Sequence, residues 1–316
     1  MKRRRIRYVA AVVMIAIVLL IMWLYSSWPP DMTDRRFGSG RVVSALVFSR
    51  DRALQLDGLL RSLYEHTAEP ELLSVAVLHK TTSAQHRRQY AELALEWGPR
   101  GVVFIEEFFF LHDLRRMLDA APAHIMFLVD DTIFLRDFSM QQVVDVLHNE
   151  EVLGFSLRLG RNTNRCFPLG RSQVVPDMNS THTRPGTALV YDWTGAEYDF
   201  GYALEVSSSV YRAADIRECI HDRNPKSPNA FESVLQECQI VNTRIPRPLL
   251  GLFDESVAVS MPHNRVQNVY GNTHGNVSSS YFADQFDDGF RLDTERYNGI
   301  KTSAAHMLLP VYLKTG

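Results

Sequence analysis

Two adjacent carboxylates, Asp130 and Asp131, end an apolar run in the segment FLVDDTIF. The run from His124 to Val129 is too short for a typical helix, and a proline and the acid pair bound it, so we predict a buried strand. The acids then lie at the carboxyl end of that strand, where open α/β sheets bind ligands. Side-by-side carboxylates repel each other unless a cation or a shared proton relieves them. A hard divalent ion that also binds a diphosphate would do so, although an acid that simply caps the next segment is the plainer alternative.

The acid pair needs a sheet to position it, and that sheet is predicted to begin with an apolar strand over Val42–Phe48. The polar turn Ser49–Arg52 follows, and then a helical pattern of leucines from Ala53 to Leu63. Ser49 or Asp51 can cap this helix, whose N-terminus would also suit a phosphate or a polar base edge. Capping alone explains these residues equally well.

Strands and helices then alternate as far as the acid pair. Strands are predicted over Leu72–Leu78 and Val102–Ile105, and helices over Gln85–Trp97 and Leu111–Leu118. This alternation predicts a parallel sheet wound by right-handed crossovers. The strand-to-helix turns contain neither a glycine-rich dinucleotide fingerprint nor a phosphate-loop motif, which argues against a nicotinamide enzyme or a P-loop NTPase.

The second half of the chain mixes short strands with loops. The polar stretch Gly160–Gly186 is predicted to be a long loop that covers a site, and Asn268–Gln285 a flexible loop. The other elements predicted here are strands over Val152–Leu157, Ala188–Tyr191, Leu204–Tyr211 and Val257–Met261, and helices over Met140–Leu147, Ala213–Cys219 and from Pro228 onward.

The 316 residues, 46% hydrophobic and 22% charged, are enough for one large or two small globular domains. The net charge of -2 provides no global basic field, so nucleic acid is not expected as a partner. The three cysteines permit at most one internal disulfide and form no metal-binding cluster. We expect core thiols, and Cys219 with Cys238 is the pair to consider in an oxidising compartment.

The N-terminus has the pattern of a membrane anchor. A basic tail of residues 1–7 precedes the uncharged apolar segment Tyr8–Tyr25, which is long enough to span a bilayer, and residues 26–40 are predicted to be a stem. Basic residues before the helix predict a cytoplasmic N-terminus and a single-pass type II protein. A cleaved signal peptide is the alternative, but the segment is long and lacks a small-x-small cleavage site.

The residues above resemble a family. The sequence SRDRALQLDGLLRSLYEHT after the first strand, followed by the acid pair after FLV, is similar to the GT-A glycosyltransferases, close to their family 2-like group. Many of those enzymes share a type II membrane anchor. The resemblance covers Arg41–His306 and is closer in the first half. It implies an α/β fold with a mixed central sheet, in which 41–135 form a Rossmann-like nucleotide-sugar half and 136–316 an acceptor half.

The resemblance also implies the donor site. Asp131 would bind a Mn²⁺ or Mg²⁺ ion that bridges the diphosphate of the nucleotide sugar, and Asp130 would contact the ribose or a metal-bound water. Ser49, Arg50 and Asp51 resemble contacts to the donor base. The family's D-x-D motif requires an acid where this chain has Thr132, which puts metal dependence in doubt.

On the acceptor side, Gly201 in DFGY resembles the family's glycine, with Trp193 and Tyr202 available to stack on a sugar. Glu232 resembles the acid at a helix start that acts as base in inverting members, although Ser233 stands where the family has Asp. We predict Glu232 in the first turn of its helix, where the dipole helps to keep a base ionised. The dipole alone also makes glutamate common in such turns.

A late histidine ligates the metal in the family. His263 resembles it, because it follows a predicted strand and precedes a predicted loop, and His306 is its competitor. The alternative for each is a structural or merely exposed histidine.

The expected function is therefore metal-assisted, inverting transfer of a sugar from a nucleotide-sugar donor to a glycan or another hydroxyl acceptor. If the enzyme is retaining, Glu232 loses its role as base. A membrane-anchored, catalytically degenerate binding module is the non-enzymatic alternative. A haloacid-dehalogenase-type phosphatase is disfavoured, because its motif requires an acid at Thr132 and a hydroxyl at Phe134. The expected location is the Golgi lumen in a eukaryote and otherwise the bacterial inner membrane.

Overall fold

The computed structural model describes residues 41–184, 186–241, 247–264, 275 and 277–316, together with Met14 and Phe37. The predicted tail, membrane span and stem therefore lie outside the described residues, apart from those two positions. Across the part of the chain that is described, none of the helices combines the length and the apolar character that a membrane span requires.

A nine-stranded mixed sheet forms the centre of the molecule, in the order β3-β2-β1-β4-β11-β6-β12-β10-β9. In its first half β2 (Leu73–Lys80) and β4 (His124–Val129) flank β1 (Val43–Arg50), and β3 (Val103–Glu106) lies at the edge. These strands are parallel, as predicted. The carboxyl ends of β1 and β4 therefore meet at one edge of the sheet, because Phe48 pairs with Val129.

The second half of the sheet contains both strand directions. β11 (Ser208–Arg212) runs antiparallel to β4 and to β6 (Val152–Ser156). Beyond them lie β12 (Leu249–Leu252), parallel to β6, and β10 (Gly186–Asp192), antiparallel to β12. The remaining strands are β5 (Thr132–Phe134), β7 (Arg165–Cys166), β8 (Arg171–Ser172), β9 (Asn179–Thr183), β13 (Ala258–Ser260), β14 (Phe290–Leu292) and β15 (Leu313–Thr315). The α/β fold with a mixed central sheet is confirmed.

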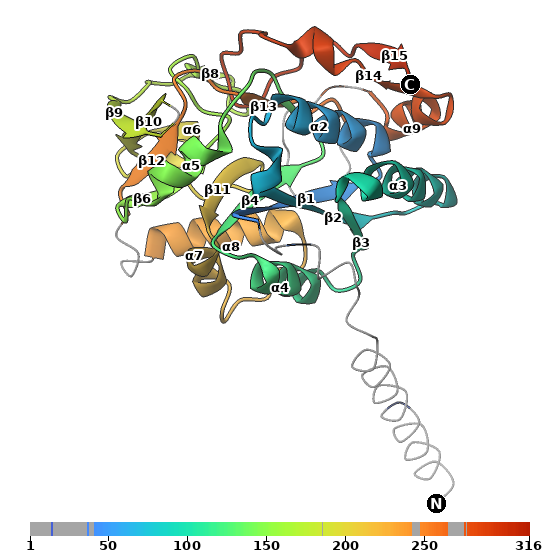
Figure 1. The fold of residues 1–316 in the computed structure, drawn as a ribbon, viewed down its shortest axis with the longest axis horizontal. Helices are drawn as coiled ribbons and strands as arrows, with labels where there is room; N and C mark the ends of the chain where they lie inside the picture. The colour runs from blue at the N-terminus through green and yellow to red at the C-terminus, as the bar shows by residue number, and fades with distance from the viewer. Residues whose placement is uncertain are drawn as a thin grey trace, which may run out of the picture.

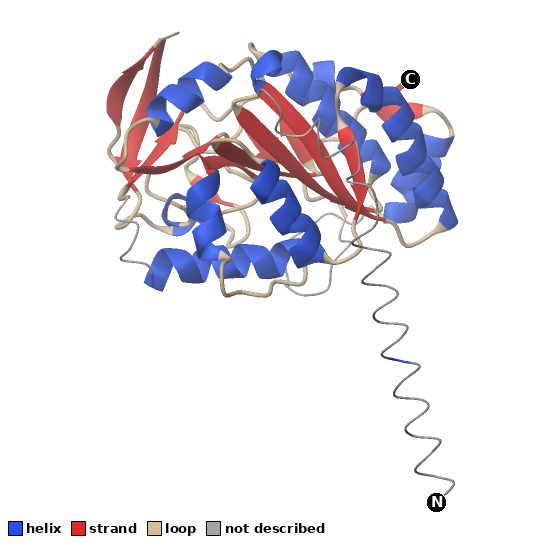
Figure 2. Cartoon of the chain, turned by 60° about the horizontal axis from the view of Figure 1, so that its bottom comes forward, coloured by secondary structure: helices blue, strands red, loops and turns tan. Residues whose placement is uncertain are grey.

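Helices cover both faces of the sheet (Figures 1 and 2). Side chains alternate along β1, so Ala45 and Val47 face one core while Leu46 and Phe48 face the other. The first core is covered by α2 (Ala53–His66), α3 (Ala84–Trp97), α5 (Met140–Leu147) and α9 (Ser279–Asp287). The second is covered by α4 (Phe110–Ala120), α7 (Ala213–Cys219) and α8 (Pro228–Val241). The short helices are α6 (Tyr198–Gly201), η1 (Pro70–Leu72), η2 (Gly98–Arg100) and η3 (Thr294–Tyr297).

A disulfide joins α7 to α8. Cys219 and Cys238 form it across 19 residues of chain, with their Cα atoms 5.5 Å apart. This is the pair considered from the sequence. Cys166 is buried as a free thiol, as expected of a core cysteine.

Three predicted loops or strands differ in the structure. The stretch Gly160–Gly186 contains β7, β8 and β9, because its polar residues form a small hairpin and the exposed edge of the sheet. The strand predicted from Leu204 begins only at Ser208. The part of Asn268–Gln285 that is described ends in α9, whose start Ser278 caps by accepting a hydrogen bond from the Tyr281 amide at 3.1 Å.

Candidate active site

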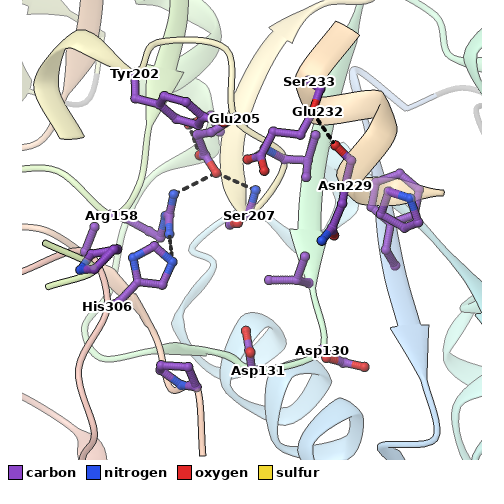
Figure 3. A pocket seen from close by; sticks show the side chains of 18 of the residues that line it. Asp130, Asp131, Arg158, Tyr202, Glu205, Ser207, Asn229, Glu232, Ser233 and His306 are labelled. Atoms are coloured by element: carbon purple, nitrogen blue, oxygen red, sulfur yellow. Dashed lines mark hydrogen bonds and ion pairs between the residues drawn. The ribbon is translucent and has the colours of Figure 1, made fainter. Parts of the chain in front are cut away.

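A cavity of about 1010 Å³ opens where the carboxyl ends of β1 and β4 face the start of α8. Both halves of the chain line it, as the side chains in Figure 3 show. Its polar lining includes Arg50, Asp130, Asp131, Arg158, Glu205 and Glu232. The sheet positions the acid pair and the helix positions Glu232, so residues a hundred positions apart share one site.

Asp130 is fixed from three sides and almost fully buried. Its Oδ2 accepts hydrogen bonds from the Ser49 hydroxyl at 2.9 Å and from the Arg50 amide at 3.0 Å. Its Oδ1 accepts one from Arg52 Nη1 at 2.8 Å. Burial raises the pKa of Asp130, while the guanidinium of Arg52 opposes that shift.

Arg52 is the cation that relieves the acid pair. Its Nη1 lies 2.8 Å from Asp130 Oδ1 and 3.2 Å from Asp131 Oδ2, and its Nη2 donates to the Asn264 carbonyl at 2.5 Å. Burial lowers the pKa of Arg52, but the two carboxylates outweigh that effect and raise it above its ordinary value. A guanidinium therefore stands where a divalent ion was predicted.

The donor residues predicted after β1 divide into two groups. Ser49 and Arg50 line the cavity, whereas Asp51 is not among its lining residues. The Asp51 carboxylate instead accepts hydrogen bonds from the amide and the hydroxyl of Thr82, both at 2.8 Å, and Asp51 has a φ of 53°. It therefore fixes the turn after β1 against the loop after β2. The predicted capping by Ser49 or Asp51 is wrong, because Arg52 is the N-cap of α2 and its side chain makes no capping hydrogen bond.

Glu232 lies in the second turn of α8, not the first, because the helix begins at Pro228. Among the described residues, its carboxylate accepts one weak hydrogen bond, at Oε1 from the Val206 amide at 3.4 Å. Burial, and after it the charge of Glu205, raises the pKa of Glu232 to about 7, although Arg158 opposes the shift. A carboxylate with this pKa is suited to proton transfer near neutral pH.

Sequence reasoning missed the buried cluster beside Glu232. Arg158 Nη2 bonds Glu205 Oε2 at 2.8 Å, and Arg158 Nη1 donates to His306 Nε2 at 3.0 Å (Figure 3). Glu205 also accepts from the Ser208 amide at 3.2 Å, from the Ser207 amide and from the Ser209 hydroxyl. Glu205 lies in the strand predicted over Leu204–Tyr211, and the alternation of apolar residues there does not tell a buried glutamate from an exposed one.

The three predicted metal ligands are not gathered in one place. His306 contacts Arg158, and burial together with that charge lowers its pKa to about 3. His263 lies on the other side of the acid pair, in a narrow cavity that Asp130, Asp131 and Phe282 also line. Within residues 41–184, 186–241, 247–264, 275 and 277–316, no three His, Cys, Asp or Glu side chains converge as a metal site. Asp131 fits a hard ion, because it offers a carboxylate oxygen at the cavity. The two histidines fit such an ion less well, because they offer nitrogen and not oxygen.

Of the predicted acceptor residues, Tyr202 lines the cavity and is 43% exposed. Trp193 points elsewhere, because its Nε1 donates to the Arg247 carbonyl at 2.8 Å. Gly201 does not line the cavity either, and a Cβ there would collide with the carbonyl oxygen of Ala196. Gly201 therefore serves the packing of α6, and no sugar contact follows from its position.

The wall near Tyr202 contains apolar residues that the sequence did not indicate. The hairpin of β7 and β8 presents Phe167 and Leu169 to the cavity, and Tyr198 of α6 lines it with a φ of 50°. The Asp199 carboxylate holds the two elements together, since Gln173 Nε2 donates to it at 3.3 Å. Leu169 is 55% exposed. Aromatic and apolar side chains with a few polar groups among them are typical of pockets that bind small molecules.

No family model matches the chain. In sequence it is 26% identical over 257 residues to the bifunctional glycosyltransferase pgtA of Dictyostelium discoideum, and the match covers 73% of this chain. The chain spans 33% of the length of that relative. A glycosyltransferase is therefore among its relatives in sequence.

Similar solved structures include S. aureus TarS in complex with UDP-GlcNAc, at a TM-score of 0.45 and 11% identity, with 76% of this chain and 69% of that chain covered. A second is the mannosyltransferase PcManGT from Pyrobaculum calidifontis in complex with GDP-Man and Mn²⁺, at a TM-score of 0.33 and 16% identity. The match covers 63% of this chain and 70% of that chain. Both TM-scores are low, so neither likeness decides the ligands of this chain.

Proposed function

We propose that this chain is a glycosyltransferase that moves a sugar from a nucleotide-sugar donor to a hydroxyl acceptor. One observation carries the proposal: Glu232, with a pKa of about 7, lines the same cavity as the acid pair at the ends of β1 and β4. A carboxylate that can accept a proton at neutral pH thus shares a cavity with a site of the kind that binds ligands in α/β sheets. The relative in sequence supports the same class.

In the proposed reaction, the acceptor oxygen forms a bond to the anomeric carbon of the donor. The bond from that carbon to the diphosphate oxygen breaks, and its electron pair leaves with the diphosphate. Glu232 takes the proton of the acceptor hydroxyl. Direct displacement of this kind inverts the anomeric centre, which is the stereochemistry we propose.

Glu232 suits the role of base better than Glu205 does. Both line the cavity, but donors from Arg158, Ser207, Ser208 and Ser209 already occupy the oxygens of Glu205. Among the described residues, only the Val206 amide donates a hydrogen bond to Glu232, at 3.4 Å. We propose that Glu205 holds Arg158 in place and keeps a fixed negative charge near the base.

The donor would lie along β1 and β4. Ser49 and Arg50 line that end of the cavity, and the exposed Lys226 lines it from the loop before α8. Arg50 and Lys226 are the side chains we propose to face the diphosphate, because Arg52 and Arg158 are committed to carboxylates. A Mn²⁺ or Mg²⁺ ion held by Asp131 would neutralise the leaving diphosphate when bound.

The acceptor would contact the wall of Phe167, Tyr198 and Tyr202, and we propose a glycan as its class. The chain's division into a nucleotide-sugar half, 41–135, and an acceptor half, 136–316, is part of the proposal. So is a single-pass type II location in the Golgi lumen of a eukaryote, or otherwise in the bacterial inner membrane. The Cys219–Cys238 disulfide supports an oxidising compartment for the globular part.

Calorimetry of the full chain in detergent against UDP, GDP and CMP sugars, with and without Mn²⁺, tests the proposal. We expect one nucleotide class to bind. The Glu232→Gln protein should bind that donor as wild type does and transfer its sugar at least about a hundredfold more slowly. If no donor binds to the folded chain, the proposal is wrong and a binding module on the same scaffold becomes the better interpretation.

A further inference from the structure

The guanidinium of Arg52 occupies the place between the two carboxylates that a metal ion would need. Arg52 lies two residues beyond the end of β1 and is 9% exposed. One of its nitrogens, Nη1, contacts both acids, at 2.8 Å to Asp130 and 3.2 Å to Asp131. Its other terminal nitrogen, Nη2, donates a hydrogen bond to the Asn264 carbonyl, so both terminal nitrogens of the guanidinium are held in place.

The hydrogen bonds leave few oxygens for an ion. Asp130 Oδ2 already accepts from Ser49 and Arg50, and its Oδ1 accepts from Arg52. Asp131 Oδ2 accepts from Arg52 as well, so Asp131 Oδ1 is the oxygen of the pair that accepts no hydrogen bond from the described residues. Divalent ions of this kind need about six oxygen ligands. One carboxylate oxygen beside a fixed positive charge makes a poor site for a free ion.

A diphosphate changes this balance. Its oxygens supply both negative charge and ligands, and Mg²⁺ in proteins is commonly held by one or two carboxylates together with substrate phosphates. Asp131 lines the large cavity, and so do the cationic side chains of Arg50 and Lys226. The ion and the diphosphate can therefore complete a coordination shell that the protein alone does not offer.

We propose that Arg52 closes the acid pair to free divalent ions, so that a metal enters this site only together with a nucleoside diphosphate. The inference rests on the proposed function for the identity of that second ligand. The exclusion of the free ion does not depend on the proposed function, because the contacts of Arg52 alone predict that the site without nucleotide does not bind the ion. Arg52 is thus a positioning residue, which acts through Asp130 and Asp131 and not on the sugar.

The experiment measures Mn²⁺ binding by electron paramagnetic resonance with the full chain. Wild type should bind Mn²⁺ at this site only after UDP or GDP is added. Arg52→Gln frees one oxygen of each carboxylate, Asp130 Oδ1 and Asp131 Oδ2, and removes the positive charge between them. This variant should therefore bind Mn²⁺ without nucleotide at least about tenfold more tightly than wild type. Arg52→Gln combined with Asp131→Asn should lose that binding again. Arg87→Gln, which removes a positive charge from the exposed side of α3, is the matched control and should behave as wild type.

Several results would overturn the inference. Tight Mn²⁺ binding by wild type without nucleotide would do so, and this measurement needs no variant to fold. A folded Arg52→Gln protein that rejects Mn²⁺ as wild type does would also do so, as would a nucleotide that binds without recruiting Mn²⁺. If no nucleotide binds under any condition, the proposed function fails, while the comparison of Arg52→Gln with wild type still decides the part played by Arg52.

Discussion

Replacing Glu232 by glutamine should make the protein less active and more stable at neutral and alkaline pH. In the fold the pKa of Glu232 rises from 4.5 to about 7, chiefly because of burial. At about 1.36 kcal/mol for each pKa unit, an ionised Glu232 costs the fold about 3 kcal/mol. Glutamine keeps the shape of the side chain without its charge, so the cost disappears.

The pH window follows from the direction of the shift. The folded state holds the proton of Glu232 more tightly than the unfolded state does, so the free energy of unfolding falls as the pH rises from 4.5 to about 7. Above that pH the loss is complete. Glu232→Gln should therefore match wild type near pH 4.5 and exceed its free energy of unfolding by up to about 3 kcal/mol at pH 8.

Urea unfolding of both proteins at several pH values measures this difference directly. Glu237→Gln, which alters an exposed acid of the same helix, is the control and should show no such pH dependence relative to wild type. The pH profile of sugar transfer should lose activity below about pH 7, as the base becomes protonated. A Glu232→Gln protein that is less stable than wild type at pH 8 would show that the ionised Glu232 does not destabilise the fold, and it would refute the raised pKa.

Three further substitutions test the neighbouring elements. Tyr202→Ala should raise the acceptor KM about tenfold and leave the donor Kd unchanged, and an altered donor Kd would contradict the acceptor assignment. Gly201→Ala should cost about 1–3 kcal/mol in urea unfolding, because its Cβ meets the Ala196 carbonyl; an unchanged midpoint would count against the packing role. Cys219→Ser opens a 19-residue loop and should lower the free energy of unfolding by about 3 kcal/mol, which reduced wild type should reproduce.

Much of the fold follows from local patterns. The strand His124–Val129 and the helices Met140–Leu147 and Ala213–Cys219 have the predicted bounds, because an apolar pattern acts over a few residues. The hairpin of β7 and β8 escaped this reasoning. Its polar residues pair locally and carry no apolar alternation, so nothing in the sequence separates them from a loop.

The site was only partly predictable for a related reason. The acid pair and Glu232 carry local signals, namely carboxylates after a buried strand and after a helix start. Arg158 and Glu205 carry none, because each is a charged residue whose burial depends on the other, 47 positions away. Arg52 was visible in the segment SRDR, but its sequence neighbours do not tell which acid it meets.

The sequence by itself determined most of the elements, their order, the parallel first half of the sheet and the acids at its edge, because hydrophobic burial and backbone geometry are local. Only the tertiary structure decided which charges meet. It gave the acid pair a guanidinium as counter-ion, placed His263 and His306 in different cavities, and set the half-buried Glu232 near the buried Glu205. Electrostatic interactions depend on distance in space and not on separation in the sequence. A charge in a buried site needs a partner beside it, because an unpaired buried charge costs free energy, however far apart the two residues lie in the chain.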